Sequence, residues 1–196
     1  MPGTRRALLS VVFGGAVPAA FAASPDPRET DRAMGGPAAP HSVIECFSLT
    51  CPHCADFALE SFPAIRSKWI EPGRLRWVFY DFPTDGAALL AAMVARSLPA
   101  DRYVPFISSL FASQAAWAYG KAGIADALWP RASDAGMDRA DFDKAVGDTH
   151  LRDWIVSRAM DAQKRWKVDA TPGFVIDGKL YEGAMSAEAF SQLLGG

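Results

Sequence analysis

The chain of 196 residues is half apolar, which is enough for one domain with a substantial core. It carries 20 Lys and Arg residues against 22 Asp and Glu residues. This near balance excludes, on composition, the strong positive field that nucleic acids and anionic membranes attract, so we expect proteins or small molecules as partners.

The first 22 residues have the pattern of a secretory signal peptide. Arg5 and Arg6 precede an apolar run that ends in Ala20-Phe21-Ala22, after which we expect cleavage. An uncleaved membrane anchor is the alternative. The paired arginines also resemble a twin-arginine signal, so the Sec and twin-arginine export routes both stay open. Either route predicts an oxidising compartment in which disulfides persist.

Residues 23–41 are expected to form a Pro- and Gly-rich linker, because breaker residues and a low apolar content argue against a packed element. The β-branched and aromatic run 42–47 then predicts a strand. A helix is expected to begin at Pro52, with a kink at Pro63, and a second strand follows at 75–80. Together these segments predict one parallel, right-handed β-α-β unit.

Residues 86–167 have a helical pattern, clearest at 87–98, 102–114 and 151–168, with breaks expected near residues 99, 120, 130 and 136. After this block, Asp177-Gly178 predicts a tight hairpin turn between two short strands, and Ser186 can cap a closing helix.

The predicted fold class is therefore α/β. A thioredoxin-like domain formed by residues 42–85 and 168–196 carries a helical insertion at 86–167.

The three cysteines, Cys46, Cys51 and Cys54, lie within one short segment, so no bridge among them can tie distant parts of the fold together. Instead, two cysteines separated by Pro52 and His53 at a helix start favour thiol-disulfide exchange. The unpaired N–H groups and the dipole of the helix N-terminus stabilise a Cys51 thiolate, and His53 can add an N–H hydrogen bond or positive charge. Cys51 is the expected attacking thiol, and Cys54 the resolving one.

A metal site is the alternative for this pair, since C-x-x-C is half of many zinc sites. The sequence has no second C-x-x-C, and His41 and His150 are isolated from it. We therefore expect no metal, while a metal-binding or chaperone module stays open as the less favoured function.

Two segments resemble the DsbA-like family of bacterial thiol-disulfide oxidoreductases. They are residues 43–54, VIECFSLTCPHC, and residues 170–179, ATPGFVIDGK. With the helical block between them, the resemblance covers nearly all of residues 42–196. It implies a periplasmic enzyme that oxidises dithiols in exported proteins and is reoxidised by a membrane partner of the DsbB type. The disulfide is the redox group, so no cofactor is expected.

The resemblance also implies roles for individual residues. A cis peptide bond between Thr171 and Pro172 would stand opposite Cys51 and expose the Thr171 backbone to an extended client segment. Glu45 would lie beneath the active site and move a proton to or from Cys54, although a strand-end carboxylate that reaches solvent is the simpler interpretation. Cys46 alternates to the opposite strand face, where we expect a small buried hydrophobic residue; a regulatory thiol is the alternative.

Direction of exchange and assembly are the remaining expectations. Thr171 stands where the best-known strong oxidants of the family carry valine, whereas threonine is common in related oxidoreductases and isomerases. A reductase or isomerase with the same residues is therefore the nearest alternative function. Only the linker precedes the catalytic strand, which offers no dimerisation element, so a monomer is expected.

Overall fold

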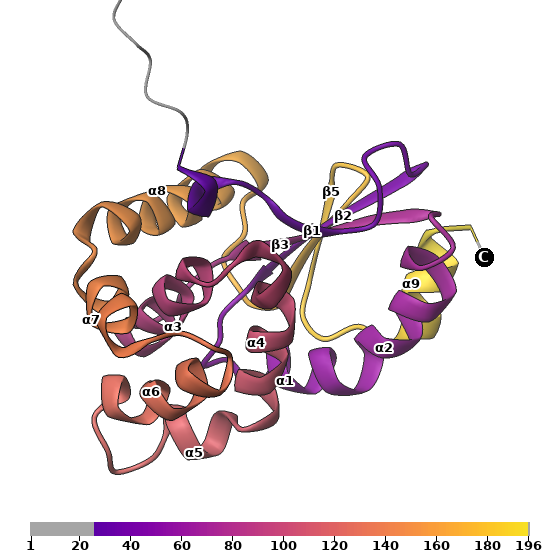
Figure 1. Ribbon diagram of the computed structural model, residues 1–196. Helices are drawn as coiled ribbons and strands as arrows, with labels where there is room; N and C mark the ends of the chain where they lie inside the picture. The colour runs from indigo at the N-terminus through magenta and orange to yellow at the C-terminus, as the bar shows by residue number, and fades with distance from the viewer. Residues whose placement is uncertain (1–25, 196) are drawn as a thin grey trace, which may run out of the picture.

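A five-stranded mixed sheet forms the centre of the computed structural model, which describes residues 26–195 (Figure 1). The strand order is β1-β3-β2-β4-β5; β2 and β3 are parallel, and the other neighbours are antiparallel. The strands are β1 (Arg32–Met34), β2 (His41–Phe47), β3 (Leu75–Asp81), β4 (Gly173–Ile176) and β5 (Lys179–Glu182). The predicted signal peptide, residues 1–22, lies outside the described residues.

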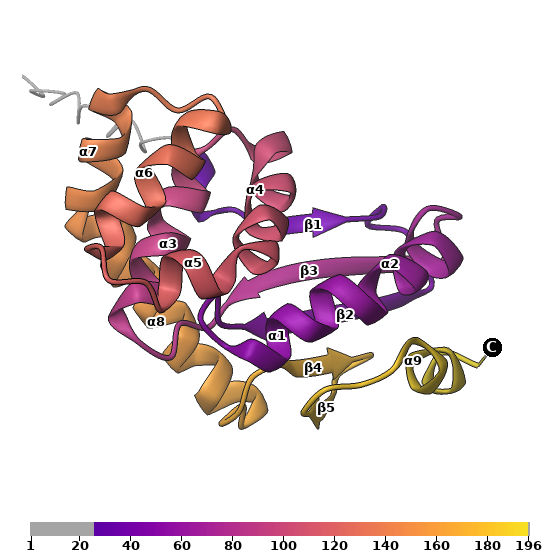
Figure 2. The same cartoon turned by 90° about the horizontal axis from the view of Figure 1, so that it is seen from below.

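Helices surround this sheet in three groups. In Figure 2, α1 and α2 run along the sheet, α3 to α8 gather at one end, and α9 lies near the other. The α-helices are α1 (Pro52–Asp56), α2 (Phe62–Ile65), α3 (Gly86–Ser97), α4 (Ala100–Ala112), α5 (Gln114–Ala118), α6 (Ile124–Asp134), α7 (Arg139–Gly147), α8 (Thr149–Trp166) and α9 (Ala187–Leu193). This order confirms the predicted plan of β-α-β, helical block and β-β-α. Within the described residues, no helix combines the length and apolarity that a membrane crossing requires.

The α-helical hydrogen-bond pattern between β2 and β3 is interrupted next to Pro63, where the sequence predicts a kink. Two π-helical segments, η2 (Phe57–Ser61) and η3 (Arg66–Ile70), flank α2. The Phe62 N–H bonds to the Phe57 carbonyl, five residues back, instead of continuing the α-helical pattern. Pro63 lacks an N–H and therefore fits at the start of the next α-helical turn.

The helical block differs from prediction at one expected break. Pro130 lies inside α6, which continues to Asp134. Leu128 and Ala132, on either side of this proline, are completely buried. Their packing outweighs the single backbone hydrogen bond that the proline removes.

A short strand lies within residues 23–41, for which the breaker pattern predicts a linker. β1 pairs antiparallel with the outer edge of β3, Ala33 opposite Val78. Three residues carry too little hydrophobic periodicity to predict a strand, and the hydrogen bonds offered by β3 decide the conformation.

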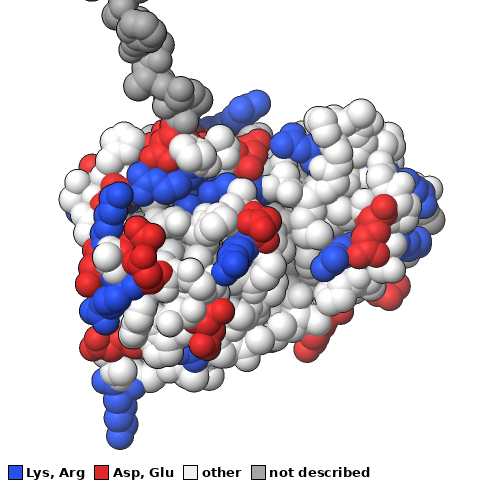
Figure 3. All heavy atoms as spheres, in the orientation of Figure 1, with Lys and Arg blue, Asp and Glu red and all other residues white. Residues whose placement is uncertain are grey.

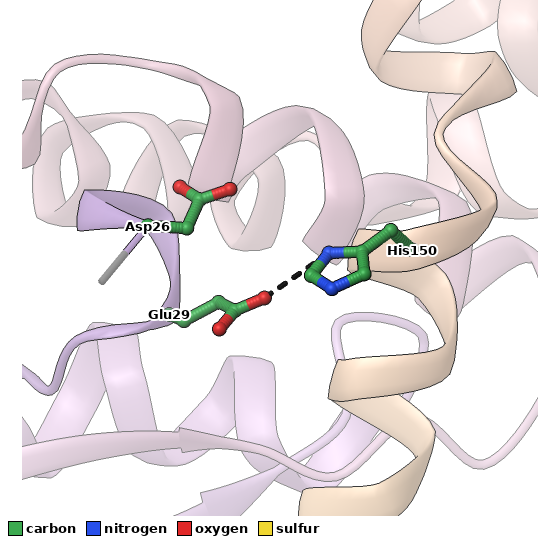
Figure 4. A group of neighbouring side chains, drawn as sticks. All are labelled: Asp26, Glu29 and His150. Atoms are coloured by element: carbon green, nitrogen blue, oxygen red, sulfur yellow. Dashed lines mark ion pairs between the residues drawn. The ribbon is translucent and has the colours of Figure 1, made fainter. Parts of the chain in front are cut away.

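Charged side chains attach this N-terminal segment to the start of α8. Arg28 binds Asp148 at 2.6 Å, and Nδ1 of His150 lies 3.2 Å from Oε1 of Glu29 (Figure 4). Over the face shown in Figure 3, basic and acidic side chains are interspersed, with wide uncharged areas between them. The surface on this side therefore fits the balanced composition.

A buried ion pair joins the helical block to the central sheet. Arg96 of α3 is fully buried and binds the carboxylate of Asp81 at the end of β3. The other oxygen of Asp81 accepts a hydrogen bond from Tyr103 of α4 at 2.9 Å, and Arg96 also donates to the carbonyls of Arg28 and Thr30. Four chain segments therefore meet at one desolvated guanidinium.

We expect Arg96→Met to lower the free energy of unfolding by about 3–5 kcal/mol, because it leaves the Asp81 carboxylate buried without its cation. Chemical denaturation measures the loss. Arg66→Met is the matched control, since Arg66 pairs with Glu71 at the surface, where an ion pair contributes about 1 kcal/mol or less. Equal losses in the two variants would contradict the structural role of Arg96.

Candidate active site

Cys51 and Cys54 lie at the N-terminus of α1, at the end of the sheet near the helical block. Cys51 is the N-cap residue with extended backbone (φ −75°, ψ 120°), and Pro52 takes the first helical position, where no N–H is needed. Cys51 is partly exposed, whereas Cys54 is fully buried. Only the first sulfur is therefore open to a partner from solution.

A hydrogen bond between the two thiols makes them chemically unequal. Cys54 donates to the Cys51 sulfur, which lowers the pKa of Cys51 to about 5. Burial opposes this shift. A hydrogen bond from the Thr171 side chain and the backbone N–H groups of Cys54 and His53 strengthen it. Burial and the bond to Cys51 raise the pKa of Cys54 far above that of a free cysteine. At neutral pH the pair therefore holds one thiolate and one thiol.

His53 contributes to the site through its backbone. Its ring is largely exposed, with Nδ1 3.9 Å from a carboxylate oxygen of Asp56. The sequence suggested that the imidazole would stabilise Cys51; the part of His53 that helps to lower the Cys51 pKa is its main-chain N–H, at the start of α1.

The Thr171–Pro172 segment lies directly against Cys51. Its peptide bond is cis, as the resemblance implies. The Cys51 sulfur lies 3.3 Å from the Thr171 carbonyl oxygen, to which the protonated thiol donates. Two segments 120 residues apart in sequence thus meet at the reactive sulfur.

Glu45 is buried on the β2 face that carries α1, with 3% of its surface exposed. Nε1 of Trp77, on β3, donates to its carboxylate at 2.9 Å. Burial raises the pKa of Glu45 to about 7, and the hydrogen bond from Trp77 opposes the rise only in part. The group can therefore gain or lose a proton near neutral pH beneath Cys54, whose pKa its charge also raises.

Cys46 lies on the opposite face of β2, away from the reactive pair. It is fully buried in a small cluster with Tyr80, Ala162 and Val168. Burial raises its pKa to about 12, so it remains a thiol and packs as a small apolar side chain.

One other group of ligand-type side chains occurs within residues 26–195. Atoms of Asp26, Glu29 and His150 lie within 4.8 Å of one another (Figure 4). The Arg28 guanidinium already donates to both carboxylate oxygens of Asp26, so these oxygens have a cationic partner within the chain. This cluster belongs to the N-terminal attachment on α8 and is remote in sequence from the cysteine pair.

Three side chains near the site had no sequence signal. Trp77 donates to Glu45, while Gln114 and Tyr119, at the two ends of α5, donate to the loop before Cys51. Gln114 lies 63 residues from Cys51, and no short motif links positions at that separation.

Comparisons with known proteins agree on the fold. The family model described as "Thioredoxin" matches residues 27–195. Wolbachia pipientis alpha-DsbA1 is 28% identical, with a TM-score of 0.78 over 84% of this chain and 89% of that chain. A protein-disulfide isomerase structure from Novosphingobium aromaticivorans is 25% identical, with a TM-score of 0.71 over 84% and 96% of the respective chains. Chlamydia trachomatis DsbA, at 14% identity and a TM-score of 0.74 over 84% and 89%, shares the fold.

A curated relative gives a similar result over a shorter part of its length. A Rickettsia typhi protein assigned as a protein-disulfide oxidoreductase is 25% identical over 149 residues, which are 76% of this chain and 55% of the relative. The chain therefore spans just over half the length of the curated relatives it matches.

Relative to Cys51→Ser, we expect the reduced protein to gain stability as the pH rises from about 5 into the range of free thiols, because the comparison cancels the opposite contribution of Glu45. Over that interval the unfolded chain carries a proton on Cys51 that the folded protein has lost, so deprotonation favours the folded state. Denaturant unfolding of the reduced protein over a pH series measures this gain. Cys51→Ser should lack it, and parallel curves for the two proteins would contradict the acidic thiol.

The contribution of Glu45 to stability changes with pH in the opposite direction. Its pKa is raised in the folded protein, so the unfolded chain loses this proton first and stability falls as the pH rises toward about 7. In the oxidised form, Glu45→Gln should gain up to about 3 kcal/mol relative to wild type between acidic pH and pH above 7. Glu60→Gln, on the exposed side of η2, is the control and should show no such trend.

Proposed function

This chain belongs to the thioredoxin family, and we propose that it is a DsbA-like thiol-disulfide oxidoreductase that introduces disulfides into exported proteins. The observation that carries the proposal is the position of Cys51. Its sulfur is partly exposed at the start of α1 and lies next to the Thr171 carbonyl. The buried Cys54 thiol lowers its pKa through a hydrogen bond.

In the proposed reaction, a client thiolate attacks Cys51 of the oxidised enzyme and breaks the Cys51–Cys54 bond. The electron pair of that bond leaves on Cys54, which takes up a proton because its pKa is high. A second client thiolate then attacks the client sulfur of the mixed disulfide, and Cys51 leaves as a thiolate. The client loses two electrons and forms a disulfide, and the enzyme is reduced to its dithiol.

The acidity of Cys51 favours this direction. Interactions that lower the pKa of Cys51 stabilise the reduced protein and have no counterpart in the disulfide. A more stable reduced form makes the oxidised form a stronger oxidant. Cys51 is also the leaving group of the second step, and a sulfur of low pKa leaves faster.

Glu45 is the proposed proton relay for Cys54. It is the carboxyl group buried beneath the pair, and a pKa of about 7 lets it deliver a proton when Cys54 is released and accept one when the disulfide forms again. The Trp77 indole holds one carboxylate oxygen, which fixes the orientation of the group.

The backbone next to the cis bond is the proposed client site. Thr171 and Pro172 lie between Cys51 and the start of β4, where an extended client segment can hydrogen-bond to main-chain groups. Such bonding depends little on client sequence, so a broad range of clients follows.

The cellular setting proposed for this activity is the periplasm, which the N-terminal sequence pattern supports through its resemblance to a signal peptide. Reduced exported proteins are the proposed clients, and a membrane protein of the DsbB type would accept the electrons. The enzyme would act as a monomer, and the disulfide itself is the redox group. Exchange of this kind needs neither a metal nor an organic cofactor.

Isomerisation or reduction by the same residues is the second candidate. Thr171, which precedes the cis-proline, favours it, as does the likeness to the Novosphingobium aromaticivorans protein-disulfide isomerase. The two directions differ in the reduction potential of the pair, which therefore separates them.

Equilibration of the protein with mixtures of reduced and oxidised glutathione tests the proposal. We expect the Cys51–Cys54 disulfide to be reduced while glutathione is still largely oxidised, and the oxidised protein to restore the disulfides of a reduced client. A potential far below that of glutathione would contradict oxidation of clients and favour the reductase.

Three controls accompany this assay. Cys51→Ala should abolish client oxidation, because no sulfur remains for the client to attack. Cys46→Ala should retain it, because Cys46 lies on the other face of the sheet. Stoichiometric zinc or copper in the reduced protein would favour a metal-binding module instead.

A further inference from the structure

The loop between β2 and α1 leaves backbone carbonyls that neither the sheet nor the helix can bind. The Cys51 N–H donates to the Ser48 carbonyl at 3.1 Å, which closes a tight turn. Within that turn, the carbonyls of Leu49 and Thr50 have no backbone partner among the hydrogen bonds of the described residues. Buried carbonyls of this kind need donors from elsewhere in the chain.

Gln114, the first residue of α5, supplies two of these donors. Its side-chain nitrogen lies 2.8 Å from the Leu49 oxygen and 3.0 Å from the Cys51 oxygen. Since both partners are acceptors, both amide hydrogens are used. The Cys51 carbonyl also accepts the first helical hydrogen bond, from Ala55 at 3.2 Å, so its two lone pairs are both engaged.

Tyr119, immediately after α5, supplies the third donor. Its hydroxyl donates to the Thr50 carbonyl, between the two carbonyls that Gln114 binds. The Tyr119 side chain is otherwise 60% exposed. Burial of the phenol raises the pKa of Tyr119, and the negative charges of Asp85 and Cys51 add to the rise.

The side chains of the loop are fixed by a different segment of the chain. Thr50 donates to Asp85 at 2.6 Å, and the Ser48 hydroxyl lies 2.8 Å from that of Thr84. These partners lie just after β3, whereas Gln114 begins α5 and Tyr119 follows its last residue. The loop is therefore held between two segments that come later in the chain.

We propose that α5 acts as a clamp on the loop before Cys51, with Gln114 and Tyr119 as positioning residues for the reactive sulfur. This inference rests on the proposed function. Neither residue is required to touch a client or to react; both act by fixing the peptide groups that lead into Cys51.

The clamp matters because the sulfur is stabilised by bonds that depend on orientation. The Cys54 thiol, the Thr171 side chain and the N–H groups at the start of α1 lower the pKa of Cys51 only while the loop and the first turn of α1 keep the sulfur next to them. A carbonyl without a donor would turn toward solvent and take the adjoining peptide plane with it. Gln114 binds two carbonyls, those of Leu49 and Cys51, whereas Tyr119 binds one, so the loss of Gln114 should affect the thiolate more.

Two variants test this. Gln114→Met keeps the length of the side chain and removes both donors, and Tyr119→Phe removes one hydroxyl. The Cys51 pKa, read from the ultraviolet absorbance of its thiolate, should rise by about one unit in Gln114→Met and by about half a unit in Tyr119→Phe. The equilibrium constant with glutathione should fall by about tenfold and threefold, toward a weaker oxidant.

Gln163→Met is the matched control, because Gln163 is an exposed glutamine of α8, away from the loop, and should leave both quantities unchanged. Folded variants with the wild-type pKa and equilibrium constant would overturn the clamp, whatever their loss of thermal stability. If Gln114→Met does not fold, Tyr119→Phe decides, since its change lies at an exposed side chain. A wild-type Cys51 that titrates as a free cysteine would instead contradict the proposed function together with the clamp.

Discussion

The chemistry of the site depends on the stabilisation of negative charge on Cys51, to which the Cys54 thiol contributes most and the N–H groups at the start of α1 add. This is a local interaction, since the backbone groups of His53 and Cys54 belong to the same helical turn as the sulfur. It has an effect only because Pro52 begins the helix without needing a partner and the β2–α1 turn places Cys51 at the N-cap.

Burial then separates the remaining groups by function. Cys54 and Cys51 are both cysteines and lie three positions apart, yet the pKa of Cys54 is raised while that of Cys51 is lowered. The same lack of water raises the pKa of Glu45, which lies beneath them, from the usual carboxylate range toward neutrality. Groups whose pKa values are pushed apart can pass a proton in one direction, which is what release of Cys54 requires. The apolar core on this face of the sheet is therefore part of the redox site.

Local patterns were sufficient to predict much of this arrangement. The strand at β2, Pro52 at the helix start and the Asp177-Gly178 hairpin each depend on neighbours in sequence, where propensity and turn chemistry act. β1, the continuation of α6 through Pro130 and the indole that holds Glu45 could not be predicted in this way. Each is decided by a partner far along the chain, and a single sequence contains no record of which partner that is.

The same distinction explains what the helical insertion contributes. Arg96 fixes one side of it to Asp81, at the end of the strand that follows the reactive helix, and α5 reaches the carbonyls before Cys51 on the other. Both contacts are made by buried polar side chains, so moving the insertion as a unit would break them together. The insertion therefore forms one side of the active-site loop, and substitutions there can change the chemistry of a sulfur that they do not touch.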